Sequence, residues 1–161
     1  MSAEARPGMT QRTDMDYRIV PMEEKHIPAV AELERVCFVH PWTEENLREE
    51  LTNGNSRFLV AEGEGVLGYA GVQEICGEAY VTNIAVFPGS RRAGIGLALT
   101  EAACRGARER NCEFITLEVR ESNFPAISMY EKLGFVPAGR RRNFYTEPAE
   151  DAILYTKYFK R

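Results

Sequence analysis

Apolar residues recur along this chain at two spacings, and the spacing separates the predicted helices from the predicted strands. Between Lys25 and Phe38 the apolar positions fall three or four residues apart, as on one face of a helix: Ile27, Val30, Leu33 and Cys37. His40-Pro41-Trp42 interrupts this pattern, because proline disfavours helix in the residue before it. Thr43 then suits the capping position of a second predicted helix, with Leu47 on its apolar side.

Seven short segments rich in β-branched and aromatic residues, separated by turn-forming residues, predict strands. They are Asp16–Val20, Arg57–Ala61, Val66–Ile75, Glu78–Val86, Glu113–Val119, Phe135–Arg141 and Ala152–Tyr158. A third helix is predicted over Gly94–Arg110, and its inward candidates include Leu97. A fourth covers Pro125–Leu133 and ends at Gly134, since proline suits a helix start and glycine the position after its end.

The order of these elements, β-α-α-β-β-β-α-β-α-β-β, predicts an α/β protein with a central mixed sheet of about seven strands and helices on both faces. The strand-helix-strand unit over residues 79–119 implies a right-handed crossover and a parallel pair of strands that flank a cleft. The length of 161 residues suits one domain. We expect that domain over residues 16–161, after a polar and flexible tail over residues 1–15.

Composition excludes several classes of protein. The chain is 44% hydrophobic and 27% charged, with a formal net charge of -4, so it has no overall attraction to nucleic acid or to an anionic membrane. No apolar run approaches the roughly 20 residues that span a bilayer, and the first residues lack the apolar stretch of a secretory signal. We therefore expect a cytoplasmic protein without a nucleic-acid or membrane partner.

The four cysteines and two histidines do not have metal-ligand spacing, so no metal is expected. The cysteines lie in apolar-looking segments and are interpreted as small buried hydrophobic residues. A disulfide between Cys104 and Cys112 is not expected, because eight residues of helix separate their positions by roughly 12 Å. His26 and His40 are interpreted as structural.

A glycine-rich loop joins the strand ending at Val86 to the third helix. Gly94 and Gly96 let the backbone approach a ligand closely, and the amides from Ala93 through Ile95 to Leu97 would converge at the helix start, where negative charge is favoured. Arg91 and Arg92 add positive charge beside these amides. A pyrophosphate fits this site, although a glycine turn with solvated arginines is the simpler alternative. The loop has neither the GK[ST] of a Walker loop nor the third glycine of a Rossmann fingerprint.

Glu118 and Tyr130 are the candidates for proton transfer. Alternation in the strand Glu113–Val119 puts Glu118 on the face opposite Leu117, where a carboxylate needs water, an arginine or a chemical role. A solvated glutamate, or one paired with Arg120, is the alternative. Tyr130 lies on the fourth predicted helix, where an aromatic ring packed on the sheet is the alternative.

Longer motifs resemble a known family. Arg91-x-x-Gly94-x-Gly96 after a strand resembles the cofactor-binding motif of the GNAT superfamily of N-acetyltransferases. The segment Leu117 to Phe135, with LEVR-x-SN followed by A-I-x-x-Y-x-x-x-GF, is similar to the bacterial ribosomal-protein-alanine N-acetyltransferases of the RimI type. His40-Pro41-Trp42 and Arg142-Asn143-Phe144-Tyr145 also match, so the resemblance covers residues 16 to 158. Glu121 and Pro125 depart from the usual pattern without touching a proposed catalytic group.

The resemblance implies an acetyl-CoA-dependent enzyme without a metal, in which Glu118 is the general base and Tyr130 the general acid. It assigns the pyrophosphate to the loop Arg91–Leu97 and the pantetheine and thioester to the backbone of Ile84, Ala85 and Val86. Asn123 is implied as a further cofactor contact.

The resemblance further implies acetyl transfer, by direct attack in a ternary complex, to the N-terminal α-amino group of a protein. An alanine-starting small-subunit ribosomal protein is the implied acceptor. Three alternatives remain at this point: a small-molecule amine or a lysine side chain as acceptor, and a catalytically silent module that binds acyl-CoA.

Overall fold

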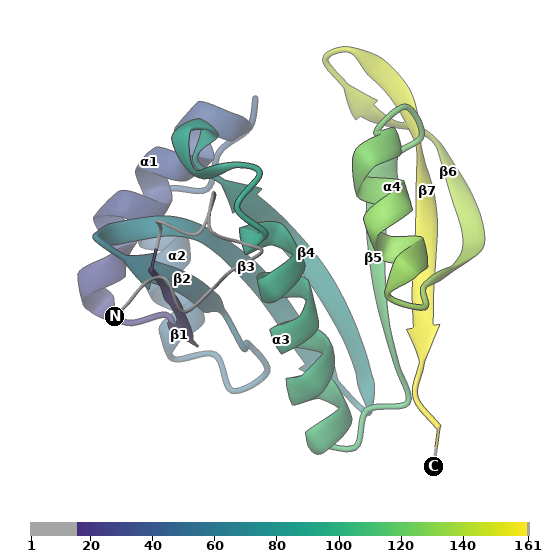
Figure 1. Ribbon diagram of the computed structural model, residues 1–161, viewed down its shortest axis with the longest axis horizontal. Helices are drawn as coiled ribbons and strands as arrows, with labels where there is room; N and C mark the ends of the chain where they lie inside the picture. Colours follow the sequence, from purple (N-terminus) through teal and green to yellow (C-terminus); the bar gives the residue numbers. More distant parts are fainter. Residues whose placement is uncertain (1–15, 161) are drawn as a thin grey trace, which may run out of the picture.

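The structure is a computed structural model that describes residues 16–160. The tail predicted over residues 1–15 lies outside the described residues. Seven strands form one sheet in the order β1-β2-β3-β4-β5-β7-β6 (Figure 1). The strands are β1 (Arg18–Pro21), β2 (Leu59–Gly63), β3 (Gly65–Ile75), β4 (Glu78–Val86), β5 (Phe114–Arg120), β6 (Val136–Thr146) and β7 (Ala149–Tyr158).

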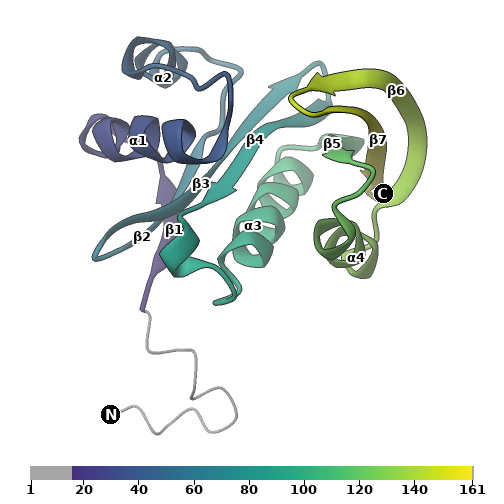
Figure 2. The ribbon, with the colours of Figure 1, turned by 90° about the horizontal axis from the view of Figure 1, so that it is seen from above.

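Four α-helices cover the two faces of the sheet, as predicted (Figure 2). They are α1 (Ile27–Cys37), α2 (Glu44–Leu51), α3 (Ile95–Glu109) and α4 (Phe124–Lys132), with short 3-10 turns η2 (Glu24–His26) and η3 (Pro88–Ser90). The helices α1 and α2 pack on β2, β3 and β4 through one apolar cluster that includes Leu33, Leu47 and Tyr69. The helices α3 and α4 pack on the opposite face.

The central feature of the sheet is the separation of β4 from β5. All pairs in the sheet are antiparallel except this one, which is parallel and holds only at Glu78↔Phe114, Ala79↔Ile115 and Tyr80↔Thr116. Beyond these pairs the two strands diverge (Figure 1). The register of β3 against β4 also skips Thr82, which forms a bulge, and bulges bend a strand. An opening therefore runs through the sheet beside the second half of β4.

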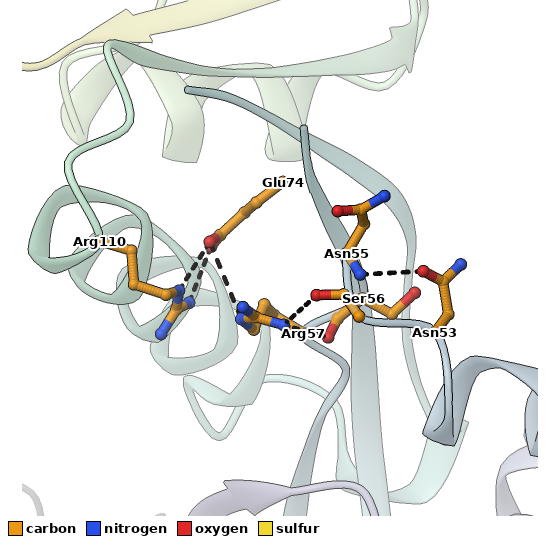
Figure 3. A network of polar contacts seen from close by, with 7 residues as sticks. Asn53, Asn55, Ser56, Arg57, Glu74 and Arg110 are labelled. Carbon is orange, nitrogen blue, oxygen red and sulfur yellow. Dashed lines mark hydrogen bonds and ion pairs between the residues drawn. The ribbon is translucent and has the colours of Figure 1, made fainter. Parts of the chain in front are cut away.

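The closed end of this opening is held by charged side chains (Figure 3). Arg110, just after α3, donates two hydrogen bonds to the nearly buried Glu74 carboxylate near the end of β3, at 2.6 and 2.7 Å. Arg57 lies 3.9 Å from the same carboxylate. This network ties α3 and the loop before β2 to the part of the sheet where β4 and β5 still pair.

Most predicted elements are confirmed, and two capping predictions hold in detail. The hydroxyl of Thr43 accepts a hydrogen bond from Asn46 N at the start of α2. Gly134 follows the last turn of α4 with a φ of 98°, a conformation that favours glycine. The last hairpin is longer than predicted, because β6 and β7 pair as far as Thr146 and Ala149.

Two predictions about burial are wrong. Leu97 faces solvent with 38% exposure, since α3 begins at Ile95 and turns Ile95, Leu99 and Ala103 toward the sheet. Cys76 is exposed in the β3–β4 turn, while Cys37 is half-buried and Cys104 and Cys112 are buried. In the described part of the chain no helix is long and apolar enough to cross a membrane.

Candidate active site

A cleft of about 880 Å³ occupies the opening between β4 and β5. Its walls come from the end of α1 and the α1–α2 loop, from β4 and β5, from the start of α4, and from the β6–β7 hairpin. Glu118 and Tyr130 both line it, together with Ile84 and Asn123. These four predicted site residues span 46 positions of the sequence, from Ile84 to Tyr130, and the structure brings them to one cleft.

The start of α3 has the properties predicted for an anion site. Gly94 is the N-cap, with a φ of 80°, and no side chain caps the helix. The first turn of a 15-residue helix therefore has backbone N–H groups without intrahelical partners, at the positive end of the helix dipole. Gly96 has open space where a side chain would project. The chemistry of these donors fits a diphosphate.

The two loop arginines differ in their surroundings. Arg91 Nε donates to Val86 O at 3.0 Å, and Arg91 Nη2 lies 3.5 Å from Cys37 Sγ, so its guanidinium lies against the end of β4. Arg92 is exposed and has a φ of 67°. The Ile95 side chain is buried in the core, whereas those of Ala93 and Leu97 are half-buried and exposed. These three residues can therefore offer their backbone to a ligand at the loop.

The backbone of β4 presents an unpaired edge to the cleft. Phe87 N donates to Leu67 O, so the polar groups of Phe87 face β3. Because successive residues of a strand alternate, those of Val86 and Ile84 face away from β3, on the side where β5 has separated. The alternation directs the polar groups of Ala85 to β3, and its side chain is buried beneath α1. The role predicted for Ala85 stays a prediction. The backbone groups of Ile84 and the N–H group of Val86 are directed to the side of the cleft, whereas Val86 O already accepts a hydrogen bond from Arg91 Nε.

Glu118 is ion-paired, but not with the predicted neighbour. Its carboxylate Oε2 lies 2.8 Å from Arg141 Nε of β6. Arg120 instead pairs with Glu150 at 3.1 Å and lies over the Tyr145 ring. The Glu118 side chain retains 28% exposure and lines the cleft, so it is accessible to a ligand.

Tyr130 packs in the core, as its alternative interpretation expected, and also lines the cleft. Its ring is buried and packs on Phe135 at a centroid distance of 5.6 Å. It nevertheless lines the cleft, and no hydrogen-bond partner of its hydroxyl occurs among residues 16–160. Burial, with a smaller contribution from Tyr145, raises the pKa of Tyr130 to about 12. The phenol is therefore protonated at neutral pH, as a general acid requires.

Glu118 and Tyr130 approach the opening from opposite faces of the sheet. Leu117 and Val119 belong to the cluster under α3 and α4, so the Glu118 side chain projects to the other face, on the side of α1. Tyr130 comes from α4 itself. A ligand group in the opening can have a carboxylate on one side and a phenol on the other.

Asn123 and His26 have structural contacts in the chain, whereas the structural role expected of His40 stays a prediction. Asn123 caps α4, where its Oδ1 accepts a hydrogen bond from Ala126 N at 3.3 Å, and it also lines the cleft. His26 is buried, accepts from Glu23 N and contacts Glu62 at 2.9 Å. His40 is exposed at the cleft. Among the described residues no three His, Cys, Asp or Glu side chains gather as metal ligands.

Sequence reasoning missed Glu34 and Asn83, which line the same cleft. Glu34 had a signal, because it follows Ile27 and Val30 on the apolar face of α1, where a carboxylate is unexpected. Asn83 was not singled out, because its partner Glu34 lies 49 positions away in the sequence. Trp42 packs on Phe58 at a centroid distance of 5.8 Å and also lines the cleft.

Residues 27–135 match the acetyltransferase (GNAT) family, and the chain belongs to that family. Within it, a curated relative is the [ribosomal protein bS18]-alanine N-acetyltransferase of Escherichia coli (strain K12). It is 35% identical over 135 residues, which are 83% of this chain and 91% of the relative.

Two solved structures support this placement. The crystal structure of the ribosomal-protein-S18-alanine N-acetyltransferase from Escherichia coli has a TM-score of 0.82 and 32% identity, and covers 91% of this chain and 96% of its own. The crystal structure of Arabidopsis thaliana NAA60 in complex with acetyl-CoA has a TM-score of 0.81 and covers 89% of this chain and 99% of its own. At 16% identity the second shows the shared fold alone.

Proposed function

We propose that this protein transfers an acetyl group from acetyl-CoA to the N-terminal α-amino group of a ribosomal protein that begins with alanine. The observation that carries the proposal is the cleft between β4 and β5, which Glu118 and Tyr130 both line beside the part of β4 that does not pair with β5. The Escherichia coli relative, named for bS18-alanine acetylation, supports the choice of acceptor. An acceptor of this kind also supports a cytoplasmic location.

The residues divide the binding of acetyl-CoA between two elements. The N–H groups at the start of α3, with Arg91 and Arg92, would hold the diphosphate. The outward backbone groups of Ile84 and the N–H group of Val86 would hold the pantetheine. When bound, acetyl-CoA supplies the acetyl group as an activated thioester. Asn123 is proposed as a further contact. Residues 16–161 are proposed as the catalytic domain, of which 27–135 match the family.

Glu118 and Tyr130 are the residues proposed to transfer protons. An α-amino group has a pKa of about 7.7–8.0, against about 10.4 for lysine, so a modest base frees its lone pair at neutral pH. Glu118 accepts that proton directly or through one water. A backbone N–H of β4 stabilises the charge that develops on the acyl oxygen. The Tyr130 hydroxyl donates its proton to the departing sulfur. Positioning amine and thioester together supplies much of the acceleration.

The cleft has room and charge for a peptide that enters amine first. Phe38, Val39 and Trp42 line one side, while Phe144 and Tyr145 line the other. The carboxylates along it, those of Glu34, Glu118, Glu147 and Glu150, outnumber the one arginine, Arg120. Such a field favours a cationic N-terminus over an anionic group.

Intact-mass measurement on a peptide series tests this function. Peptides that differ only in their first residue are incubated with protein and acetyl-CoA, beside an N-terminally blocked peptide with an internal lysine and a panel of small amines. We expect one acetyl group on the alanine peptide and none on the blocked peptide. Faster transfer to a small amine or to the blocked peptide would identify the alternative acceptor. Binding of acetyl-CoA without transfer to any amine would indicate a silent module.

A further inference from the structure

A fully buried carboxylate lies beneath the cleft and has no role in the mechanism above. Glu34 has 0% relative exposure, and the described residues place no lysine, arginine or histidine in an ion pair with it. Burying a carboxylate without a cation is unfavourable unless hydrogen bonds compensate it. An apolar side chain at this position of α1 would serve packing better, so the carboxylate points to a role in the site.

Three donors from three elements surround this carboxylate. Trp42 N, in the α1–α2 loop, donates to Oε1 at 2.9 Å. Asn83 Nδ2, on β4, donates to Oε2 at 3.0 Å, and the Tyr69 hydroxyl on β3 donates to the same oxygen. Glu34 thus connects the α1–α2 loop, which lines one side of the cleft, to β4 next to the bulge at Thr82.

The carboxylate dictates how the Asn83 amide is oriented. A carboxylate can only accept hydrogen bonds, so the NH₂ group of Asn83 must face Glu34 and the carbonyl oxygen must face elsewhere. That oxygen, Asn83 Oδ1, is buried and has no hydrogen-bond partner among the described residues. Asn83 as a whole is half-buried and lines the cleft. A buried acceptor without a partner costs stability, and it is complementary to a ligand that carries an N–H group.

The face of the sheet on which Asn83 lies indicates which ligand supplies that N–H group. Asn83 shares its face with Ala85, which packs beneath α1, and Glu118 projects to this same face from β5. The side chains of Ile84 and Val86 lie on the opposite face, against α3. Asn83 and Glu118 therefore flank the opening on the side from which an acceptor can reach Glu118.

We propose that Asn83 Oδ1, held in orientation by Glu34, accepts a hydrogen bond from the acceptor's amine and positions it for transfer. Glu34 is a positioning residue, because it acts through Asn83. Entry of the amine includes a local adjustment of the Asn83 side chain, since Oδ1 lies just beneath the cleft surface. This inference rests on the proposed function and names the residue that recognises its acceptor.

The substitution Glu34→Gln tests the inference without removing the network. Trp42 N can only donate, so the glutamine oxygen must accept its hydrogen bond. The NH₂ group of the glutamine then takes the place of Oε2. Tyr69 can then accept instead of donate, while Asn83 must turn its oxygen to the glutamine and its NH₂ group to the cleft. The amine would meet a donor in place of an acceptor. We expect the KM for an alanine-starting peptide to rise about tenfold, with the Kd for coenzyme A within about twofold of wild type.

A second substitution is expected to restore recognition. In the double variant Glu34→Gln with Asn83→Asp, the glutamine NH₂ group donates to one aspartate oxygen and leaves the other as an acceptor. The KM for the peptide should return toward the wild-type value. Tyr69→Phe is the control, because it removes one hydrogen bond to Glu34 but keeps Asn83 oriented. It should lower the Tm and leave the peptide KM nearly unchanged.

Steady-state kinetics, calorimetry with coenzyme A and thermal unfolding of the four proteins distinguish the outcomes. A wild-type peptide KM in Glu34→Gln, or a double variant no better than the single one, overturns the inference. A raised Kd for coenzyme A with an unchanged peptide KM also overturns it, because Asn83 would then contact the pantetheine. Failure of wild-type protein to acetylate any alanine-starting peptide contradicts the proposed function instead.

Discussion

At the scale of single residues, the proposed chemistry depends on what burial does to each proton-carrying group. Glu118 remains partly exposed and lies within ion-pair distance of Arg141, so its carboxylate is accessible from the cleft. Tyr130 is buried to 5% exposure, which disfavours its phenolate. One group is thus prepared to accept a proton and the other to donate one, and both states follow from the surroundings of the side chains.

We predict that Glu118→Gln and Tyr130→Phe each lower kcat by about 10²-fold or more, with little change in the Kd for coenzyme A. The pKa of Tyr130 is raised to about 12, so its proton is present at every pH below that value. Between pH 7 and about 10 the wild-type kcat should therefore show no alkaline decline from Tyr130. Steady-state rates across this range test the prediction.

Full activity in both variants would contradict these roles. So would an alkaline decline below about pH 10 that Tyr130→Phe abolishes, because the phenol would then lose its proton in the range where burial should retain it.

At the scale of elements, the start of α3 is the part of the fold for which anion binding is proposed. Gly94 adopts a left-handed conformation that lets the chain enter the helix abruptly, and no side chain covers the first turn. Gly96 has no heavy atom within 4 Å of the position of an added Cβ. The free protein therefore has no packing reason for glycine at 96.

We predict opposite effects of Gly96→Ala on stability and on binding. Alanine is favoured over glycine within a helix by up to about 1 kcal/mol, so the free energy of unfolding should stay equal or rise. The added methyl group would stand where the diphosphate approaches, and the Kd for coenzyme A should rise about tenfold, which corresponds to about 1.4 kcal/mol. Thermal unfolding and calorimetry measure the two effects.

Gly89→Ala is the matched control for this loop. Gly89 also has open space around an added Cβ, and its φ lies outside the left-handed region. It precedes the loop Arg91–Leu97 that is proposed to bind the diphosphate, so its substitution should leave the Kd for coenzyme A unchanged. Equal loss of affinity in both variants would show that the effect comes from general stiffening of the loop.

At the scale of the whole molecule, the sheet is closed at one end and open at the other. The parallel pairs of β4 and β5 close one end, where Arg110, Glu74 and Arg57 connect α3 with the sheet (Figure 3). The cleft occupies the other end. The stabilising ion pairs and the proposed catalytic residues therefore lie at different ends of the same sheet.

We predict that Arg110→Ala lowers the free energy of unfolding by about 1 kcal/mol, because the nearly buried Glu74 carboxylate becomes less well paired. The loss stays moderate because Arg110 is itself partly exposed, which weakens the ion pair. The kcat at 25 °C should stay within about twofold of wild type, since the network lies outside the cleft. Denaturant unfolding and steady-state assays measure both quantities.

Arg105→Ala, an exposed position on the same helix, is the control and should change stability by less than about 0.5 kcal/mol. A large loss of kcat in Arg110→Ala, with the fold intact, would show that the closed end sets the geometry of the opening.

The sequence by itself determined the elements and the chemistry they carry. Apolar spacing located all four helices and all seven strands, since burial on one face of an element leaves a period of 3.6 or 2 in the chain. Motifs indicated the glycine loop, Glu118 and Tyr130, because proton transfer and anion binding demand particular residue types.

Only the tertiary structure decided which residues meet. The pairing of Glu118 with Arg141, in place of Arg120, depends on the strand order that puts β6 beyond β7 from β5. The network of Glu34 with Asn83 joins residues 49 positions apart. The exposure of Leu97 depended on the rotation of α3 against the sheet. Such contacts arise from the packing of distant elements, which leaves no local period or spacing in the sequence.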